Sequence, residues 1–134
     1  MTDYEAIIDV LLNESSITDK VAKLINNAGS ATAFPAVMFG DLPDNQVVYP
    51  AISLRRLTKD KLNGIETGFF ICDCWAETMT ASVILAEAVD ELFTDSFVFA
   101  SDYAFKSTSD IISTVSDGTY NNTPVNIKVT YIRR

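Results

Sequence analysis

The chain has 134 residues, of which 48% are hydrophobic, and its formal net charge is −8 from 18 acidic and 10 basic residues. This length suits one domain with its own core, which excludes a disordered chain. A conventional nucleic-acid binder is disfavoured, because such binding needs many Lys and Arg side chains to displace counterions from phosphates. There is no His, so the commonest general base and metal ligand is missing.

The chain opens with the pattern of an amphipathic helix. Five apolar residues recur at helical spacing: Tyr4, Ile7, Ile8, Leu11 and Leu12. Thr2 and Glu5 form a capping box in front of them. This acidic start lacks the basic-then-apolar order of a secretory signal, and no run of about 18 apolar residues follows. We therefore expect a cytosolic origin and no membrane partner.

A second short helix is predicted after Thr18, with Val21, Leu24 and Ile25 as its apolar face. Residues 26–29, Asn-Asn-Ala-Gly, would end it. Residues 28–50 then contain three prolines and two glycines, which indicates a connecting segment. Within it we expect a brief strand at 37–39 and an extended stretch at 46–49.

Two strands follow, at residues 51–57 and 65–76. The polar stretch 58–64 is predicted to join them as a hairpin connection, with Asn63-Gly64 as the turn dipeptide. The second strand alternates: Phe69, Ile71, Asp73 and Trp75 face one way, and Phe70, Cys72 and Cys74 face the other. Mostly apolar residues on both faces imply burial by a helix on one side and by a neighbour or partner sheet on the other.

A third helix begins almost at once, capped by Thr78 or Thr80. Its broad apolar stripe comprises Val83, Ile84, Leu85, Ala88, Val89, Leu92 and Phe93. Strands are expected at 97–106, 111–116 and 125–132, with a turn at Asp117-Gly118 and with Pro124 starting the last strand. The order of two helices, two strands, a helix and three strands predicts an α+β fold. One antiparallel sheet would carry helices on one face, in a single domain spanning 1–134.

We expect no catalytic, cofactor-binding or metal site. Cys72 and Cys74 could be redox-active, but the strand that carries them is predicted to be buried, which favours core residues. Asp73 with Glu77 could act as a carboxylate pair, but a structural carboxylate at an interface or a helix cap accounts for it better. The other loop acids lack calcium-loop spacing, and the five glycines form no phosphate loop.

One strand–helix passage is similar to a known family. It runs from Tyr49-Pro50-Ala51-Ile52-Ser53-Leu54, through Phe70-Ile71-Cys72-Asp73-Cys74-Trp75-Ala76-Glu77-Thr78, to the rhythm Ala81-Ser82-Val83-Ile84-Leu85-Ala86-Glu87-Ala88-Val89. This passage resembles the tail-completion, or tail-terminator, proteins of long-tailed double-stranded-DNA phages. The resemblance is good over residues 49–93 and looser over 1–93, and the last forty residues match only as further strands.

The resemblance implies a structural virion protein in the tail or neck, assembled in the host cytoplasm. It would form a homo-oligomeric ring, a hexamer, that caps the tail tube and joins the tail to the head connector or stopper protein. Genomic DNA would pass through an acidic lumen without specific binding. Candidate subunit-interface residues are Asp73, Trp75, Lys59, Lys61, Asn63 and the terminal pair Arg133 and Arg134. The strand 65–76 and the segment 28–48 are suited to supply the head-to-tail contacts that a ring needs.

Two alternatives stay open. One is another head–tail connector, neck or minor tail subunit. The other is a cytosolic ligand-binding or thiol-dependent enzyme domain, which predicts an apolar pocket and a reactive Cys72 or Cys74.

Overall fold

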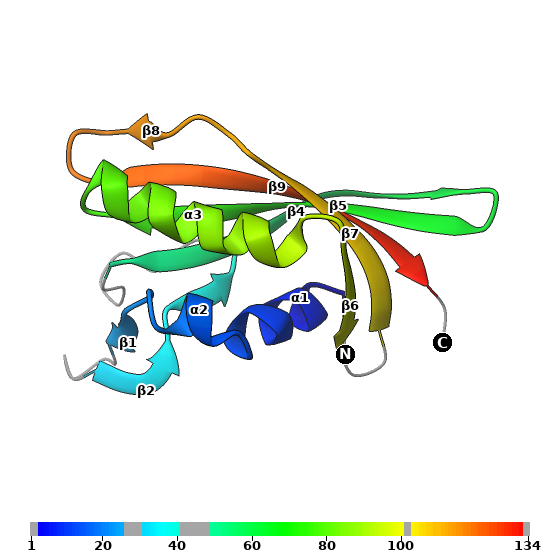
Figure 1. Ribbon diagram of the computed structural model, residues 1–134, viewed down its shortest axis with the longest axis horizontal. Coiled ribbons are helices and arrows are strands. Elements are labelled where there is room, and N and C mark those ends of the chain that lie inside the picture. Colours follow the sequence, from blue (N-terminus) through cyan, green and yellow to red (C-terminus); the bar gives the residue numbers. More distant parts are fainter. Residues whose placement is uncertain (1–2, 26–30, 41–48, 101–102, 133–134) are drawn as a thin grey trace.

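The computed structural model describes residues 3–25, 31–40, 49–100 and 103–132 (Figure 1). In chain order its elements are α1 (Asp3–Leu12), α2 (Ser15–Thr18), β1 (Lys23–Ile25), β2 (Ala31–Pro35), β3 (Val37–Phe39), β4 (Ala51–Leu62), β5 (Ile65–Ala76), α3 (Met79–Phe93), β6 (Ser96–Ala100), β7 (Tyr103–Ile111), β8 (Val115–Ser116) and β9 (Asn121–Ile132). The predicted α+β class is confirmed.

The main sheet of the described residues has seven strands. Six of them lie in the order β3-β4-β5-β9-β7-β6, and the short β8 pairs with β9 beyond the end of β7. Every pairing in this sheet is antiparallel except the parallel pair β3–β4. The strands β1 and β2 pair with each other as a separate antiparallel ribbon. The predicted antiparallel sheet is thus confirmed, with one parallel edge strand added.

One face of the sheet carries the helices, as predicted. Cys72 in the middle of β5 lies between Leu54 of β4 and Val125 of β9, and all three side chains are fully buried. They belong to a hydrophobic cluster with residues of all three helices, among them Leu11, Ile17 and Leu85. Fully burying side chains of this size contributes about 1.5–3 kcal/mol each, so this cluster is the main source of stability. Figure 1 shows α3 lying along β5 and β9, and α1 below it.

The helix α3 begins where the sequence indicates. The Thr78 hydroxyl accepts a hydrogen bond from the Ala81 backbone N–H at 3.2 Å, so Thr78 rather than Thr80 is the cap. The predicted stripe lies against the sheet, with one exception. Ile84 is 47% exposed, because it lies on the flank of the helix next to the polar side that carries Glu87 and Glu91.

The second predicted helix is wrong. The helical turn spans Ser15–Thr18 and therefore ends at the residue expected to start it. Leu24 and Ile25 lie in β1, which pairs with β2, a strand that the sequence did not indicate. A three-residue strand is too short to show a period, and its pairing with β2 rather than its local pattern decides its conformation. The expected strand at 37–39 is confirmed as β3, whereas the predicted helix stop at 26–29 and residues 46–48 lie outside the described residues.

Three predictions for the C-terminal strands are also corrected. The strand expected at 111–116 is reduced to β8 at Val115–Ser116, because Ile111 ends β7. The single strand expected at 97–106 is an antiparallel pair, β6 and β7. Pro124 lies inside β9 rather than at its start. On the neighbouring side of β9 there is a break at this position. The pairing of β7 with β9 ends at Val125 of β9, and the pairing of β8 with β9 begins at Asn122 of β9. A residue without an N–H is tolerated there because the neighbouring strand is interrupted. The predicted turn at Asp117-Gly118 is confirmed.

Candidate subunit interface

The sheet face away from the helices is only partly covered. Phe69, Ile71 and Trp75 of β5 point to this open face and are each half-buried, whereas their neighbours Phe70 and Cys72 are buried under the helices. The two-sided alternation predicted for β5 is therefore confirmed. Within the described residues, the helices cover one face only. Side chains of the open face remain partly available to another molecule.

A polar cluster occupies part of this open face. Asp73 is buried, and its carboxylate accepts hydrogen bonds from Arg55 Nε and from Asn122 Nδ2, both at 2.9 Å. Beside it, Trp75 Nε1 donates to the Ser53 hydroxyl at 3.1 Å. Asp73 is thus a hydrogen-bonded structural carboxylate, and its bonds go to the sheet rather than to a helix end. Among the described residues, Asn122 Oδ1 is buried without a hydrogen-bond partner.

The β4–β5 hairpin is longer than the sequence predicts. Residues 58–62, expected in a polar connection, continue β4, and the turn is only Asn63-Gly64. Both turn residues have positive φ, 52° and 81°, which favours this dipeptide. The pairing of β5 with β9 begins at Thr67, so the tip is a two-stranded ribbon projecting beyond the sheet (Figure 1). Leu62 and Ile65 at this tip are 73% and 57% exposed.

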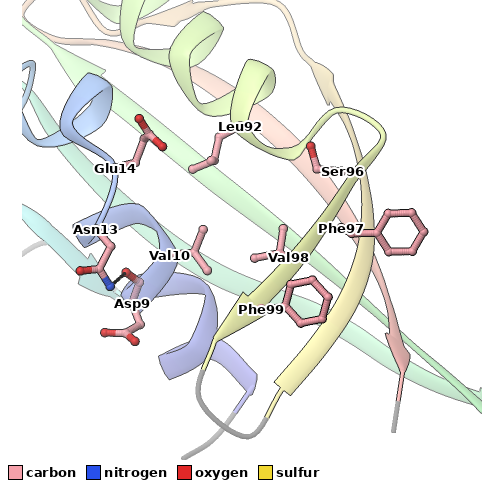
Figure 2. Close-up of a pocket in the computed structure, with 9 residues that line it drawn as sticks. All are labelled: Asp9, Val10, Asn13, Glu14, Leu92, Ser96, Phe97, Val98 and Phe99. Atoms are coloured by element: carbon pink, nitrogen blue, oxygen red, sulfur yellow. Dashed lines mark hydrogen bonds between the residues drawn. The ribbon is translucent and has the colours of Figure 1, made fainter. Parts of the chain in front are cut away.

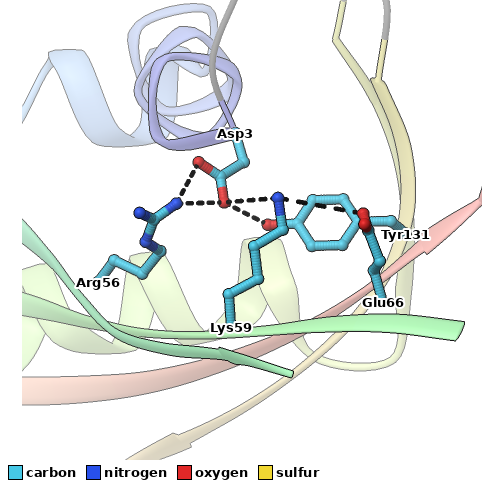
Figure 3. A network of polar contacts seen from close by, with 5 residues as sticks. All are labelled: Asp3, Arg56, Lys59, Glu66 and Tyr131. Atoms are coloured by element: carbon cyan, nitrogen blue, oxygen red, sulfur yellow. Dashed lines mark hydrogen bonds and ion pairs between the residues drawn. The ribbon is translucent and has the colours of Figure 1, made fainter. Parts of the chain in front are cut away.

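The base of the hairpin is fastened to the N-terminal helix (Figure 3). Asp3 is buried, and Arg56 Nη1 donates to both of its carboxylate oxygens at 3.0 Å. The Tyr131 hydroxyl donates to the same carboxylate at 2.8 Å, and Lys59 Nζ lies 4.0 Å from it. Burial, followed by the hydrogen bond to Asp3, raises the pKa of Tyr131 well above its ordinary value. This network joins α1, β4 and β9, so it fixes the direction in which the hairpin leaves the sheet.

Gly68 makes room for this network. A Cβ at Gly68 would lie 2.7 Å from the Tyr131 hydroxyl oxygen and 3.2 Å from Val129 Cγ2. Any larger residue would displace the Tyr131 side chain from Asp3. The glycine in β5 is therefore explained by this close approach.

A groove lies at the opposite edge of the sheet, between α1, α3 and β6 (Figure 2). Its volume is about 570 Å³. Figure 2 shows Val10, Leu92 and Val98 pointing into the space between these elements, and Phe97 pointing outward. Asp9, Asn13 and Glu14 lie on the α1 side, and none of the described lining residues is basic. No local sequence pattern indicates this groove, because its walls come from three separate segments.

The predicted interface residues do not form one patch. Asp73 and Trp75 lie on the open face. The Asp73 carboxylate already accepts hydrogen bonds from Arg55 and Asn122 within the chain. Lys59 turns to the helix side, where it also lies over the Tyr131 ring at 5.1 Å. Lys61 and Asn63 are exposed at the hairpin tip, and Arg133 and Arg134 lie outside the described residues. Sequence reasoning missed the exposed apolar pair Leu62 and Ile65. Leu62 was expected within the polar connection, and Ile65 as the first residue of the following strand.

Both cysteines are free and fully buried, as predicted for core residues. The Cys74 thiol donates to the Cys72 backbone carbonyl at 3.7 Å. A side-chain hydrogen bond with Cys72, and next to it burial, raise the pKa of Cys74 well above its ordinary value. A thiol held in the neutral form is a poor nucleophile.

Within the described ranges, no group of three or more Cys, Asp or Glu residues is placed to hold a metal ion. None of the helices seen in the described part of the chain is long and apolar enough to cross a membrane.

Comparison with known proteins gives a likeness at the level of fold. No protein-family model matches the chain, and no curated protein matches its sequence. Among solved structures, the fold is similar to that of a chain in the virion of a native gene transfer agent particle, with a TM-score of 0.58. That likeness covers 95% of this chain and 92% of the other, at 9% sequence identity. The shared architecture thus extends over nearly the whole of both chains.

Proposed function

We propose that the protein is a structural subunit of a phage-like particle. In this role it forms a ring, a hexamer, that caps the tail tube and joins the tail to the head connector, and DNA passes through the ring. In this role residues 1–134 form one non-enzymatic domain, and its partners are further copies of itself, the tube protein and the connector or stopper protein.

The observation that carries the proposal is the fold likeness to a chain of a gene transfer agent virion, which leaves little of either chain unmatched. The strand–helix resemblance to tail-completion proteins over residues 49–93 supports the same class independently, because it rests on sequence. The finer role, tail completion, rests on that resemblance alone.

The surface of the chain suits a subunit that is completed by neighbours. Half-buried Phe69, Ile71 and Trp75 lie on an open sheet face, and exposed Leu62 and Ile65 end a projecting hairpin. Apolar groups distributed over separate surfaces are typical of subunits with more than one contact. In a closed ring each subunit needs two different complementary surfaces.

The test is to assemble the particle with and without this chain and to examine it by electron microscopy. We expect overlong tail tubes and unattached heads without the chain, and restoration of both when the wild-type chain is supplied. Tubes of normal length with unattached heads would overturn tube capping and assign the chain to the connector or neck. Normal particles would exclude both roles.

Ring formation is measured separately, from the mass of the purified protein alone and with tube protein. A six-subunit species in either sample is expected. Monomer in both samples would contradict the ring. The acidic lumen is tested by the same particles, since a basic channel surface in a reconstruction would contradict it.

A further inference from the structure

We infer that the groove between α1, α3 and β6 binds an extended, basic segment of another protein, which adds to the outer edge of β6 as a further strand. The segment has aliphatic residues at its centre and lysine or arginine beside them. Binding there does not depend on the proposed ring, because a single chain contains the whole groove.

The groove runs along the edge of the sheet rather than against one of its faces. Ser96, Phe97, Val98 and Phe99 all line it, although Val98 points towards the helices and Phe97 points away from them (Figure 2). Successive residues of a strand point to opposite faces, so only the edge of the strand lies next to all of them. At an edge, alternate backbone N–H and C=O groups point outward and can pair with an added strand.

The outer edge of β6 is suited to accept that strand. The sequence of β6, Ser-Phe-Val-Phe-Ala, contains no charge and no proline, and its pairing with β7 continues without a bulge. Charges, proline and bulges are the features that keep an edge from pairing. In contrast, β4 carries Lys59, Lys61 and a bulge after Arg56. Among the strands of the described residues, only β7 pairs with β6, which leaves one side of β6 for strand addition.

The inner surface of the groove is aliphatic. It is formed by Val10, Leu92 and Val98, which belong to or pack against the hydrophobic core and are therefore held in place. The volume of about 570 Å³ falls in the range of about 300–1,000 Å³ that is usual for ligand sites in proteins. A strand laid along β6 would place every second side chain over this surface.

The charges around the groove favour a cationic segment. Asp9 and Glu14 line the α1 side and are half-buried. Glu14 accepts a hydrogen bond from the Ser16 hydroxyl at 3.1 Å, but the ion pairs of the described residues include neither acid. Both α1 and α3 end at the groove, and neither has a basic residue in its last turn. The C-terminal end of a helix carries a partial negative charge that stabilises a cation.

Another protein supplies such a segment better than a second copy does. The chain has only 10 basic residues against 18 acidic ones. In the main sheet, acids or aromatic rings of the same chain already engage most of the cations: Arg55, Arg56, Lys59, Lys106 and Lys128. The remaining one, Lys61, stands directly across from Glu66. An extended segment of this chain therefore has little cationic charge to offer the groove.

The test measures the binding of three fluorescent peptides to the full chain. The basic probe, Lys-Thr-Val-Thr-Val-Thr-Lys, places its valines and lysines on one face of a strand. In the second peptide Pro-Pro replaces the second Thr-Val, which keeps the charge but prevents pairing. In the third, glutamate replaces both lysines. We expect the Pro-Pro peptide to bind at least about tenfold more weakly than the basic probe, because it lacks N–H donors, and the glutamate peptide not to bind. Equal affinities of the basic and Pro-Pro peptides, or no binding of the basic probe, would overturn strand addition.

Charge variants and hydrogen exchange locate the site. Asp9→Lys and Glu14→Lys should each weaken binding of the basic probe about two- to fivefold, as for an exposed ion pair. Glu87→Lys makes the same change in net charge at an exposed position of α3 outside the groove, and should alter the affinity by less than about twofold. The basic probe should slow exchange of outward backbone amides within Ser96–Val98. Equal weakening by all three variants, or slowing confined to other strands, would contradict this location.

Exchange of the same amides without peptide distinguishes a second copy from a foreign partner. We expect it to be independent of protein concentration. Slowing that grows with protein concentration and that the basic probe competes away would assign the groove to a second copy and overturn the inference. Tail length in assembled particles tests the proposed function and enters none of these readouts, so either can fail without the other.

Discussion

Arg56, in the β4–β5 hairpin, donates hydrogen bonds from Nη1 to both carboxylate oxygens of Asp3, 53 positions earlier in the chain, at 3.0 Å each. Asp3 is 3% exposed and Arg56 is 38% exposed, so the acid is buried and the base lies at the surface. A buried carboxylate is stable only when its charge is compensated. The hairpin is therefore tied to the N-terminal helix by an ion pair rather than by its own strand pairing alone.

The first prediction concerns this pair. Arg56→Ala should lower the free energy of unfolding by about 1–3 kcal/mol, because it removes both hydrogen bonds that Arg56 donates to the buried Asp3 carboxylate. The lower part of that range allows for the solvent exposure of Arg56. Urea unfolding measures the loss. Lys61→Ala, at an exposed position on the same strand, is the control and should change stability by less than about 0.5 kcal/mol. Equal effects of the two substitutions would contradict the role given to Arg56.

The second prediction concerns alkaline pH. The pKa of Tyr131 is raised in the folded protein, so the folded state holds the phenolic proton more tightly than the unfolded state does. The stabilisation is therefore complete below the ordinary value of 10.0 and is lost as the pH rises above it. Cys74, whose pKa is also raised, contributes in the same direction above its ordinary value of 9.0.

Urea unfolding at several pH values checks this dependence. The free energy of unfolding should decline more steeply above pH 10 in the wild type than in Tyr131→Phe. The Tyr131→Phe variant should still show the smaller decline that the raised pKa of Cys74 causes. An unchanged slope in Tyr131→Phe would show that the Tyr131 proton is not linked to folding. Ultraviolet titration of the five tyrosines should likewise show one that ionises last.

The third prediction separates two threonines at the start of α3. Thr78→Ala should lower the free energy of unfolding by about 1 kcal/mol, because it removes the hydroxyl that accepts the hydrogen bond from the Ala81 N–H. Thr80 lies two residues further on and is exposed. Thr80→Ala should therefore leave the free energy of unfolding within about 0.5 kcal/mol of that of the wild type. Thermal or urea unfolding of both variants measures the difference. A larger loss at Thr80 would reverse the assignment of the cap.

The fourth prediction concerns the thiols. Cys72 and Cys74 should react with a thiol reagent only as fast as the protein opens, because both are buried and the Cys74 pKa is raised. Adding urea should accelerate labelling in parallel with unfolding, whereas Lys61→Cys provides an exposed thiol that reacts at once. Rapid labelling of the native wild-type protein would favour the thiol-dependent enzyme class over a structural subunit.

Local sequence signals predicted several elements well. The spacing of apolar residues located α1 and α3, Thr78 was one of two residues expected to cap α3, and Asn63-Gly64 marked the hairpin turn. The alternation along β5 correctly grouped Cys72 with Phe70 on one face, which is the face that the helices bury. Each of these features depends on residues within a few positions of one another, where backbone preference and periodicity are sufficient.

Features that depend on distant partners were missed. The strand β1 was predicted as a helix because three residues carry no period, and its conformation depends on pairing with β2. The division of β6 from β7 was missed because an apolar run does not show where a chain reverses. The β4 strand was cut short at residue 57 because residues 58–61 are polar, although pairing with β5 continues through a bulge between Arg56 and Thr58.

The sequence by itself determined the class of fold, the alternation of side chains along β5 and the burial of the cysteines, since these follow from local pattern and hydrophobicity. The tertiary structure alone decided that Arg56 and Tyr131 converge on Asp3, that Leu62 and Ile65 stand exposed on a projecting tip, and that α1, α3 and β6 enclose a groove. These arrangements join segments far apart in the chain. Their geometry is set by strand order and helix packing, which no single segment encodes.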